Sequence, residues 1–136
     1  MVIISTALYI CASWNGSVGM LSLKKEAVLA LRMLGDSGYE AYIIGGCVRD
    51  YLMGREPGDI DITTSARPEE IKEVFRFFRV IETGIKHGTV TVIIYDVSLE
   101  ITTYRVDGIY SDSRHPDKVS FTKSLREDAA RRDFTI

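Results

Sequence analysis

The segment spanning residues 41–63 constrains the fold most, because two strand patterns enclose a pair of glycines. Residues 41–44 form a short apolar run that ends at this pair, and residues 59–63 alternate acidic and apolar side chains. Alternation with a period of two is typical of a strand with one buried face. Residues 48–53, between the two runs, have a short helical pattern. The order of strand, glycine turn, helix and strand predicts a sheet with helices packed against it.

Helical patterns flank this segment on both sides. Residues 22–34 place apolar side chains near one helical face, with Ser22 as the expected N-cap and Gly35 as the expected end. Pro68 is expected at the first position of a further helix, because its fixed φ suits that position. Two helices therefore accompany the two strand patterns.

Strand patterns dominate the second half of the chain. Residues 89–95 are rich in β-branched side chains and residues 99–104 alternate again, so a short turn around Asp96 is expected to join them as a hairpin. The fold class is predicted as α+β, with a mixed or antiparallel sheet flanked by helices. The remaining patterns are two short strands, a polar loop and a capping box that opens a last helix, at 80–82, 119–122, 107–118 and Ser124-x-x-Glu127.

Length and composition indicate one globular domain. The chain has 136 residues, 46% hydrophobic and 26% charged, which excludes a disordered, collagen-like or coiled-coil protein. The net charge of −2 lacks the basic excess of a self-sufficient nucleic-acid binder, so any RNA would have to be held mostly elsewhere. Two cysteines are too few for a disulfide framework, and a reducing cytoplasmic location is expected.

The two ends of the chain differ from its middle. Residues 2–12 are mostly apolar but far shorter than a membrane span, and no basic residue precedes Lys24, as a secretory signal would require. Residues 1–21 are interpreted as an N-terminal extension: a short first strand, a disordered tail or an over-extended start ahead of Met20. Residues 22–136 form the domain, and its abrupt end predicts that it is the front piece of a longer protein.

Asp59 and Asp61 form the strongest candidate for a chemical site. On a strand they share one side, while the isoleucines between them face the core. Neighbouring carboxylates repel unless a cation lies between them, and oxygen ligands of this kind suit Mg²⁺. Two such ions about 3.5–4 Å apart can activate a hydroxyl and stabilise a leaving pyrophosphate. The alternative is an edge strand that carries two solvated acids.

The glycine pair, Gly45-Gly46, and Arg49 are candidates for binding phosphate. Glycines let the backbone approach a ligand, and the start of the following helix offers free N–H groups. Arg49 lies close enough in sequence to add a guanidinium to the same phosphates. The alternative is an ordinary tight turn with a surface pair between Arg49 and Asp50.

Two further sets of residues could complete the site. Glu100 alternates with apolar neighbours, so it is expected to point away from the core, either towards the two aspartates or simply into solvent. Arg131, Arg132 and Asp133 could neutralise triphosphate charge and bind ribose hydroxyls. Their alternative role is as cations at the end of a helix. His87 is interpreted as a structural or loop histidine.

These motifs together resemble the head domain of the class II tRNA nucleotidyltransferase and bacterial poly(A) polymerase family, specifically its CCA-adding enzymes. The resemblance covers residues 22–136, and its combination of motifs is highly specific. The matching stretches, in order, are GGCVRDYLMG, GDIDITTSARPEEI, KHGTVTV, LEITTYRVDG-Y-D and RRDFTI.

The resemblance implies a nucleotidyltransferase fold of the DNA polymerase β type. It also implies transfer of CMP and AMP from CTP and ATP to the 3′ end of tRNA without a template. Carried over by position, Asp59 and Asp61 hold catalytic magnesium and Glu100 is a third carboxylate, while 107–118 matches a flexible segment tied to the switch from C to A addition. The matched nucleotide contacts are Gly45, Gly46, Arg49, Arg132 and Asp133.

Parts of the family pattern are missing from this chain. The base-selecting neck and the tRNA-holding body and tail are absent, so the chain has only the chemical half of the site. The alternatives are a poly(A) polymerase, a partial C- or A-adding enzyme, or a truncated, non-catalytic module that binds magnesium and nucleotide. We expect the isolated chain to bind Mg²⁺ and nucleotide weakly and to add little or no CCA.

Overall fold

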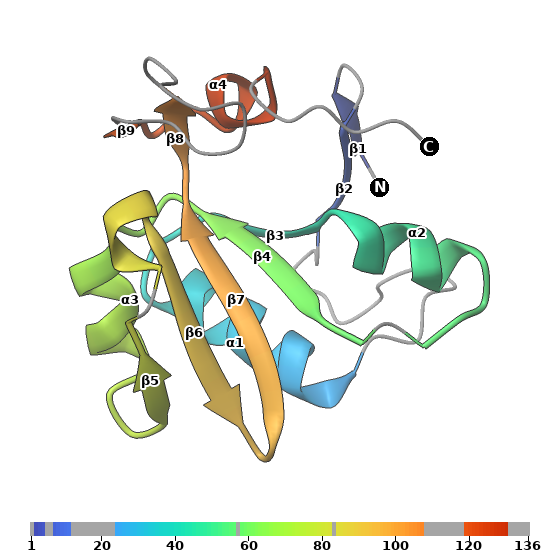
Figure 1. The fold of residues 1–136 in the computed structure, drawn as a ribbon, viewed down its shortest axis with the longest axis horizontal. Coiled ribbons are helices and arrows are strands. Elements are labelled where there is room, and N and C mark those ends of the chain that lie inside the picture. The colour runs from blue at the N-terminus through green and yellow to red at the C-terminus, as the bar shows by residue number, and fades with distance from the viewer. Residues whose placement is uncertain are drawn as a thin grey trace.

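The central feature of the fold is one mixed β-sheet. The computed structural model describes residues 2–4, 7–11, 24–56, 58–82, 84–107 and 119–130. Within these ranges, seven strands form a sheet in the order β1-β2-β3-β4-β7-β6-β5 (Figure 1). Its only parallel pair in these ranges is β4 with β7, and the other neighbours are antiparallel. The strands are β1 (Val2–Ile4), β2 (Ala7–Cys11), β3 (Ala41–Ile44), β4 (Ile60–Thr64), β5 (Arg79–Ile81), β6 (Thr89–Ile94) and β7 (Val97–Thr103).

Helices cover one face of this sheet, which confirms the predicted α+β class. Helices α1 (Lys25–Asp36) and α3 (Pro68–Val74) contact each other and lie against the strands on that face (Figure 1). Helix α2 (Gly46–Leu52) follows β3 directly, and a short 3-10 helix, η1 (Ile85–His87), precedes β6. In the part of the chain that the structure describes, no helix is long and apolar enough to cross a membrane.

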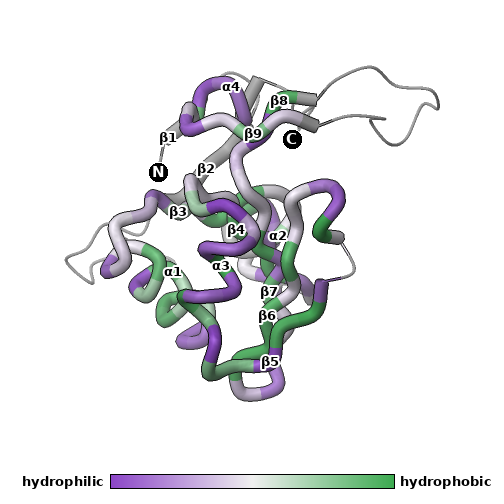
Figure 2. Tube along the Cα trace, turned by 90° about the vertical axis from the view of Figure 1, so that its left-hand side faces the viewer, coloured by the Kyte–Doolittle hydropathy of each residue, from purple (hydrophilic) through white to green (hydrophobic). Residues whose placement is uncertain are grey.

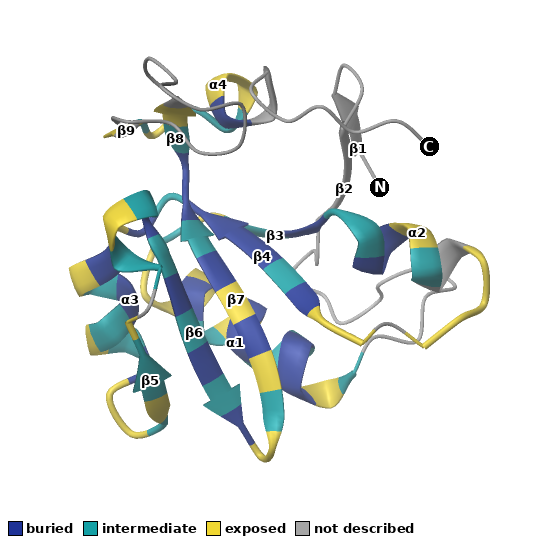
Figure 3. Ribbon diagram, viewed as in Figure 1, coloured by how far each residue is buried: buried dark blue, intermediate teal, exposed yellow. Residues whose placement is uncertain are grey.

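The core lies between the helices and the sheet. Strand positions in register across the sheet supply Ile43, Ile62, Ile101 and Val90, which are all buried. The hydropathy view shows hydrophobic residues gathered along β5, β6 and β7, whereas α3 carries hydrophilic residues (Figure 2). Buried and exposed positions alternate along β7 (Figure 3). This period-two pattern leaves the opposite face of the sheet for polar side chains.

The predicted hairpin is confirmed. Strands β6 and β7 pair antiparallel through a two-residue turn at Tyr95 and Asp96, whose φ angles are 47° and 69°. Two positive φ values give the turn the twist that suits a tight hairpin. The hairpin places β7 beside β4, which brings the second half of the chain against the Asp61 strand.

A smaller two-stranded sheet lies beyond the end of β7. It pairs β8 (Arg105–Asp107) with β9 (Val119–Phe121), and helix α4 (Leu125–Ala130) follows. Strand β8 was not expected from the sequence, because its three residues, with one apolar side chain, are too few to show a strand period. Residues 108–118, most of the predicted loop, lie outside the described residues.

Gly88 joins the small sheet to the main one. Its φ is +81°, and a Cβ built on it would lie 2.6 Å from the Phe121 ring. The Arg105 guanidinium also donates to the His87 carbonyl oxygen, at 2.5 Å. The KHG motif therefore provides a docking point for β8 and β9, and His87 contributes to it through its backbone.

Two predicted helix ends were wrong, and one capping box is half formed. Helix α1 begins at Lys25 with Lys24 at its N-cap, rather than after Ser22, and Gly35 lies inside its last turn rather than ending it. At α4, Ser124 Oγ accepts from the Glu127 amide at 3.3 Å, as predicted. The Glu127 carboxylate instead accepts from the Thr122 hydroxyl. Helix ends depend on such local partners, which the hydrophobic pattern does not encode.

For residues 1–21, the structure describes two strands. Strand β1 pairs with β2, and β2 pairs with β3 through Ile10 opposite Ile43. Residues 12–23 lie outside the described residues. The boundary between an N-terminal extension and a domain at 22–136 therefore stays a prediction.

Candidate active site

Asp61 and Glu100 occupy neighbouring positions on the polar face of the sheet. They are register partners in the parallel pair of β4 and β7, so their side chains emerge from the same face. Glu100 is exposed and Asp61 is partly buried. Strand β4 lies inside the sheet between β3 and β7, so Asp61 is not on an edge strand, which was the alternative interpretation.

Asp59 stands just before this strand. It is exposed and comes one residue ahead of Ile60, the first residue of β4. The isoleucines at 60 and 62 are buried, as the alternation predicted. Asp59 therefore lies just before the first residue of β4, and its side chain is exposed to solvent.

The glycine turn touches the carboxylate of Asp61. Gly45 has φ +76°, and a Cβ built there would lie 3.3 Å from Asp61 Oδ2. Glycine is the residue that adopts this backbone conformation without strain and leaves room for the carboxylate. The structure thus brings together two motifs that the sequence separates by fifteen residues.

Arg49 lies over the second glycine of the turn. A Cβ built on Gly46 would lie 3.4 Å from the Arg49 Nη2 atom. The same guanidinium forms an ion pair with Asp50, with 3.3 Å between Nη2 and Oδ1. The surface pair proposed as an alternative is therefore present, and it holds a cation beside the glycine turn. The Arg49 side chain is 49% exposed, so it remains accessible to a ligand.

Cys47 is buried beneath this turn. Its Sγ lies 2.9 Å from the Ile44 carbonyl oxygen, to which the thiol donates. Burial raises the pKa of the Cys47 thiol to about 11; the negative charge of Asp61 adds to the rise, and a hydrogen bond from the Asp61 backbone opposes it. Sequence reasoning missed this position, because a single cysteine gives no signal of what it contacts.

The raised pKa predicts a stability change at high pH. The thiol titrates at about 11 in the folded chain against 9.0 ordinarily, so the unfolded chain loses its proton first as pH rises. The stabilisation is complete below about pH 9 and is lost between about pH 9 and 11. Urea unfolding of the native chain should therefore lose up to about 2–3 kcal/mol relative to Cys47→Ser over that range. Equal pH profiles for the two proteins would contradict this prediction.

The donor chemistry of the three carboxylates fits magnesium. Mg²⁺ prefers oxygen ligands and commonly takes one or two carboxylates while keeping several waters. Over the described ranges, no group of three or more histidine, cysteine, aspartate or glutamate side chains is gathered closely enough to hold a metal ion. Asp61 and Glu100 are register partners on neighbouring strands, so a cation between them would offset the repulsion of two adjacent carboxylates.

Two predicted nucleotide contacts cannot be placed. Arg132 and Asp133 lie outside the described residues, immediately after α4 in the sequence. Their roles stay predictions.

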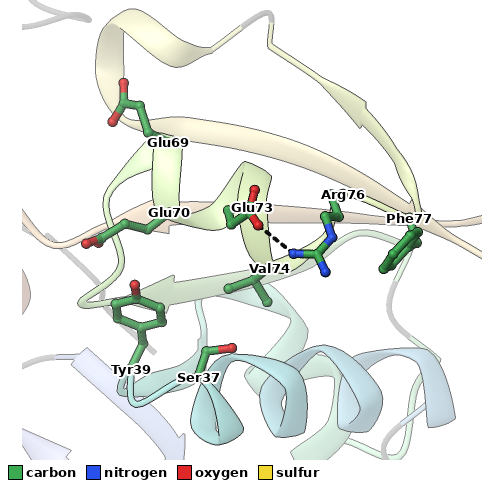
Figure 4. Close-up of a pocket in the computed structure, with 8 residues that line it drawn as sticks. All are labelled: Ser37, Tyr39, Glu69, Glu70, Glu73, Val74, Arg76 and Phe77. Carbon is green, nitrogen blue, oxygen red and sulfur yellow. Dashed lines mark hydrogen bonds and ion pairs between the residues drawn. The ribbon is translucent and has the colours of Figure 1, made fainter.

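A pocket on the helix-covered side does not belong to this site. Its volume is about 430 Å³, and it lies between the end of α1 and α3 (Figure 4). Three glutamates line it, with a Glu73–Arg76 ion pair of 2.5 Å, so it would repel an anionic phosphate. The lining residues are Ser37, Tyr39, Glu69, Glu70, Glu73, Val74, Arg76 and Phe77.

Sequence reasoning also missed a buried contact between α4 and β4. The Thr63 hydroxyl donates to Asp128 Oδ2 at 3.0 Å, and both residues are fully buried. Thr63 lies two residues after Asp61 on β4 and on the same face of the sheet. A buried acid on a short helix has no sequence signal of its own, because its partner is 65 residues away.

Comparisons with known proteins agree with the fold and with the predicted family. A family profile described as "Poly A polymerase head domain" matches residues 41–136. The chain is 50% identical over 112 residues to a CCA-adding enzyme of Enterococcus faecalis, covering 82% of this chain and 27% of that protein. The chain therefore spans about a quarter of the length of this relative.

Two solved structures share the fold. One is the crystal structure of a Bacillus stearothermophilus CCA-adding enzyme in complex with CTP, with a TM-score of 0.69 and 42% identity over 82% of this chain and 26% of that one. The other is a tRNA nucleotidyltransferase complexed with a primer tRNA and an incoming ATP analogue. It has a TM-score of 0.57 and 32% identity over 77% of this chain and 28% of that one.

Proposed function

The chain belongs to the poly A polymerase head domain family, and from that premise we propose that it is the catalytic head of a tRNA nucleotidyltransferase. Such an enzyme adds CMP and AMP from CTP and ATP to the 3′ end of tRNA. The observation that carries the proposal is the contact of Asp61 with the Gly45 turn, with Glu100 in register beside it. A carboxylate pair beside a glycine turn and an arginine suits a metal-bound triphosphate.

Each group has a distinct role in the proposed reaction. Asp59 and Asp61 would hold Mg²⁺, with Asp61 fixed against the turn and Asp59 open to solvent, and Glu100 is the third carboxylate beside Asp61. Bound Mg²⁺ supplies activation of the attacking 3′ hydroxyl and charge stabilisation for the leaving pyrophosphate. Gly45 and Gly46 let the phosphates approach the backbone closely.

Arg49 and the residues after α4 would bind the part of the nucleotide's negative charge that Mg²⁺ does not neutralise. The Arg49 guanidinium beside Gly46 can donate two hydrogen bonds to the triphosphate and exchange its Asp50 partner for it. Arg132 is proposed to contact the nucleotide and Asp133 to assist at the sugar. The tRNA would be held mostly by regions beyond this chain, which agrees with the net charge of −2.

The names of the relatives favour CCA addition over the sibling activities. The E. faecalis relative is a CCA-adding enzyme, and the B. stearothermophilus structure is a CCA-adding enzyme in complex with CTP. A poly(A) polymerase or a partial C- or A-adding enzyme would share the same head chemistry. A cytoplasmic location is proposed with the function.

Calorimetric titration of the chain with CTP in the presence of Mg²⁺ tests the proposal. We expect weak binding that requires the metal, and an Arg49→Gln variant weakened about tenfold to a hundredfold, as loss of a charged contact of about 1.5–3 kcal/mol implies. Arg55→Gln is the matched control, because Arg55 is exposed and lies past the end of α2. Metal-independent binding, or equal losses in both variants, would count against the proposed site.

A further inference from the structure

Asp128 is a buried carboxyl group whose two oxygens both accept hydrogen bonds. It is 0% exposed. Thr63 Oγ1 donates to Oδ2 at 3.0 Å, and the Arg105 backbone N–H donates to Oδ1 at 3.1 Å. Burying a carboxyl group costs free energy unless its oxygens are bonded in this way. The arrangement therefore depends on both partners being held in place.

These bonds connect three elements that are far apart in the sequence. Asp128 lies on α4, Thr63 on β4 and Arg105 on β8. Arg105 in turn donates through its guanidinium to the His87 carbonyl oxygen, at 2.5 Å. Figure 3 shows α4 beside β8, beyond the end of the main sheet. One side chain thus ties α4 to the strand that carries Asp61.

The position of Thr63 gives this tie its significance. Thr63 and Asp61 share the polar face of β4, two residues apart. Helix α4 is followed directly in the sequence by Arg131, Arg132 and Asp133. The buried contact of Asp128 therefore lies two residues along β4 from Asp61, and it is made by the helix that precedes these three residues in the sequence.

We propose that Asp128 is a positioning residue that fixes α4 and β8 to the strand that carries Asp61, and so holds Asp61 in place for the bound nucleotide. The proposal rests on the proposed function for the role of Asp61. The tie itself rests only on the contacts of Asp128.

The first test uses the sign of an effect on binding. Asp128→Ala removes both hydrogen-bond acceptors and a carboxylate near a site for an anionic ligand, so electrostatics alone would tighten binding of CTP with Mg²⁺. A positioning role instead predicts about tenfold weaker binding, the scale seen when a supporting partner of a ligand group is lost. Glu127→Ala is the matched control, because it removes a carboxylate one residue away on an exposed side chain. It should leave the dissociation constant unchanged or slightly lower.

A second variant removes the other partner in this contact, which lies on β4. Thr63→Val keeps the shape and charge but removes the hydroxyl donor, and it should weaken binding to a similar extent. Because both substitutions remove the same contact, the double variant should bind nucleotide no more weakly than the weaker-binding of the two single variants. Additive losses, or tighter binding by Asp128→Ala, would overturn the proposal. Near-UV circular dichroism ensures that only folded variants are compared.

Hydrogen exchange tests the tie without any nucleotide. In Asp128→Ala, amides of α4 and β4 should exchange about tenfold faster, while those of β5 and β6 keep their native rates. Uniformly faster exchange across the chain would show a general stability effect and overturn the proposal. If the native chain binds no nucleotide, the proposed function fails, and the exchange pattern still decides whether Asp128 joins α4 to β4.

Discussion

Replacing Asp61 with alanine, in an enzyme that carries this head, is expected to lower nucleotidyl transfer by about a thousandfold or more. A bound metal supplies several kcal/mol of transition-state stabilisation in such reactions. Loss of about 4 kcal/mol corresponds to about three factors of ten in rate. Asp61 is the carboxylate that lies against Gly45 and is paired in register with Glu100, so its loss removes the proposed metal ligand at the turn.

Two measurements separate this effect from unfolding. Extension of a tRNA that lacks its CCA end reports the activity, and magnesium titration of the chain itself reports the metal site. Thermal unfolding should change little, because Asp61 is only partly buried. Asp36→Ala removes an exposed carboxylate at the end of α1 and serves as the control, with activity retained. An Asp61→Ala enzyme that extends tRNA at the native rate would refute the assignment.

The largest expected effect on stability comes from Phe75. Its ring is 0% exposed at the end of α3, and it packs beside Phe78 with 6.5 Å between ring centroids. Removing a buried aromatic ring leaves a cavity and loses its transfer free energy, together about 3–5 kcal/mol. Phe75→Ala should therefore lower the free energy of unfolding, measured in urea, by about that amount.

The chain offers a control two residues away. Phe77 is 83% exposed, and its ring makes one cation–π contact, with the Arg76 guanidinium 4.8 Å from the centroid. Phe77→Ala should cost less than about 1 kcal/mol. Equal losses from the two variants would mean that burial at Phe75 does not stabilise the fold.

Much of the fold could be predicted from the sequence because it depends on local patterns. The strand at 41–44, the helix opened by Pro68 and the hairpin around Asp96 follow from side-chain period and turn chemistry. The motifs also predicted the family, which the match over residues 41–136 confirms. Each of these signals lies within a few neighbouring residues.

Other features depend on residues far apart in the sequence and could not be predicted from it. The parallel register that sets Asp61 beside Glu100 is decided by the whole sheet, and strand β8 exists because β9 pairs with it. The packing of Gly45 against Asp61 required the turn and the strand to be placed together. The contact of Thr63 with Asp128 joins residues whose local patterns are unrelated.

The parallel pairing of β4 with β7 has a consequence for biosynthesis. A nascent chain that has left the ribosome only as far as β4 contains Asp61 without Glu100, its neighbour in the finished sheet. The β6–β7 hairpin is local and closes quickly, whereas joining it to β4 requires a long loop to close first. We therefore expect cation-binding ability to arise late during translation, after the hairpin has docked, so that truncated products lack it.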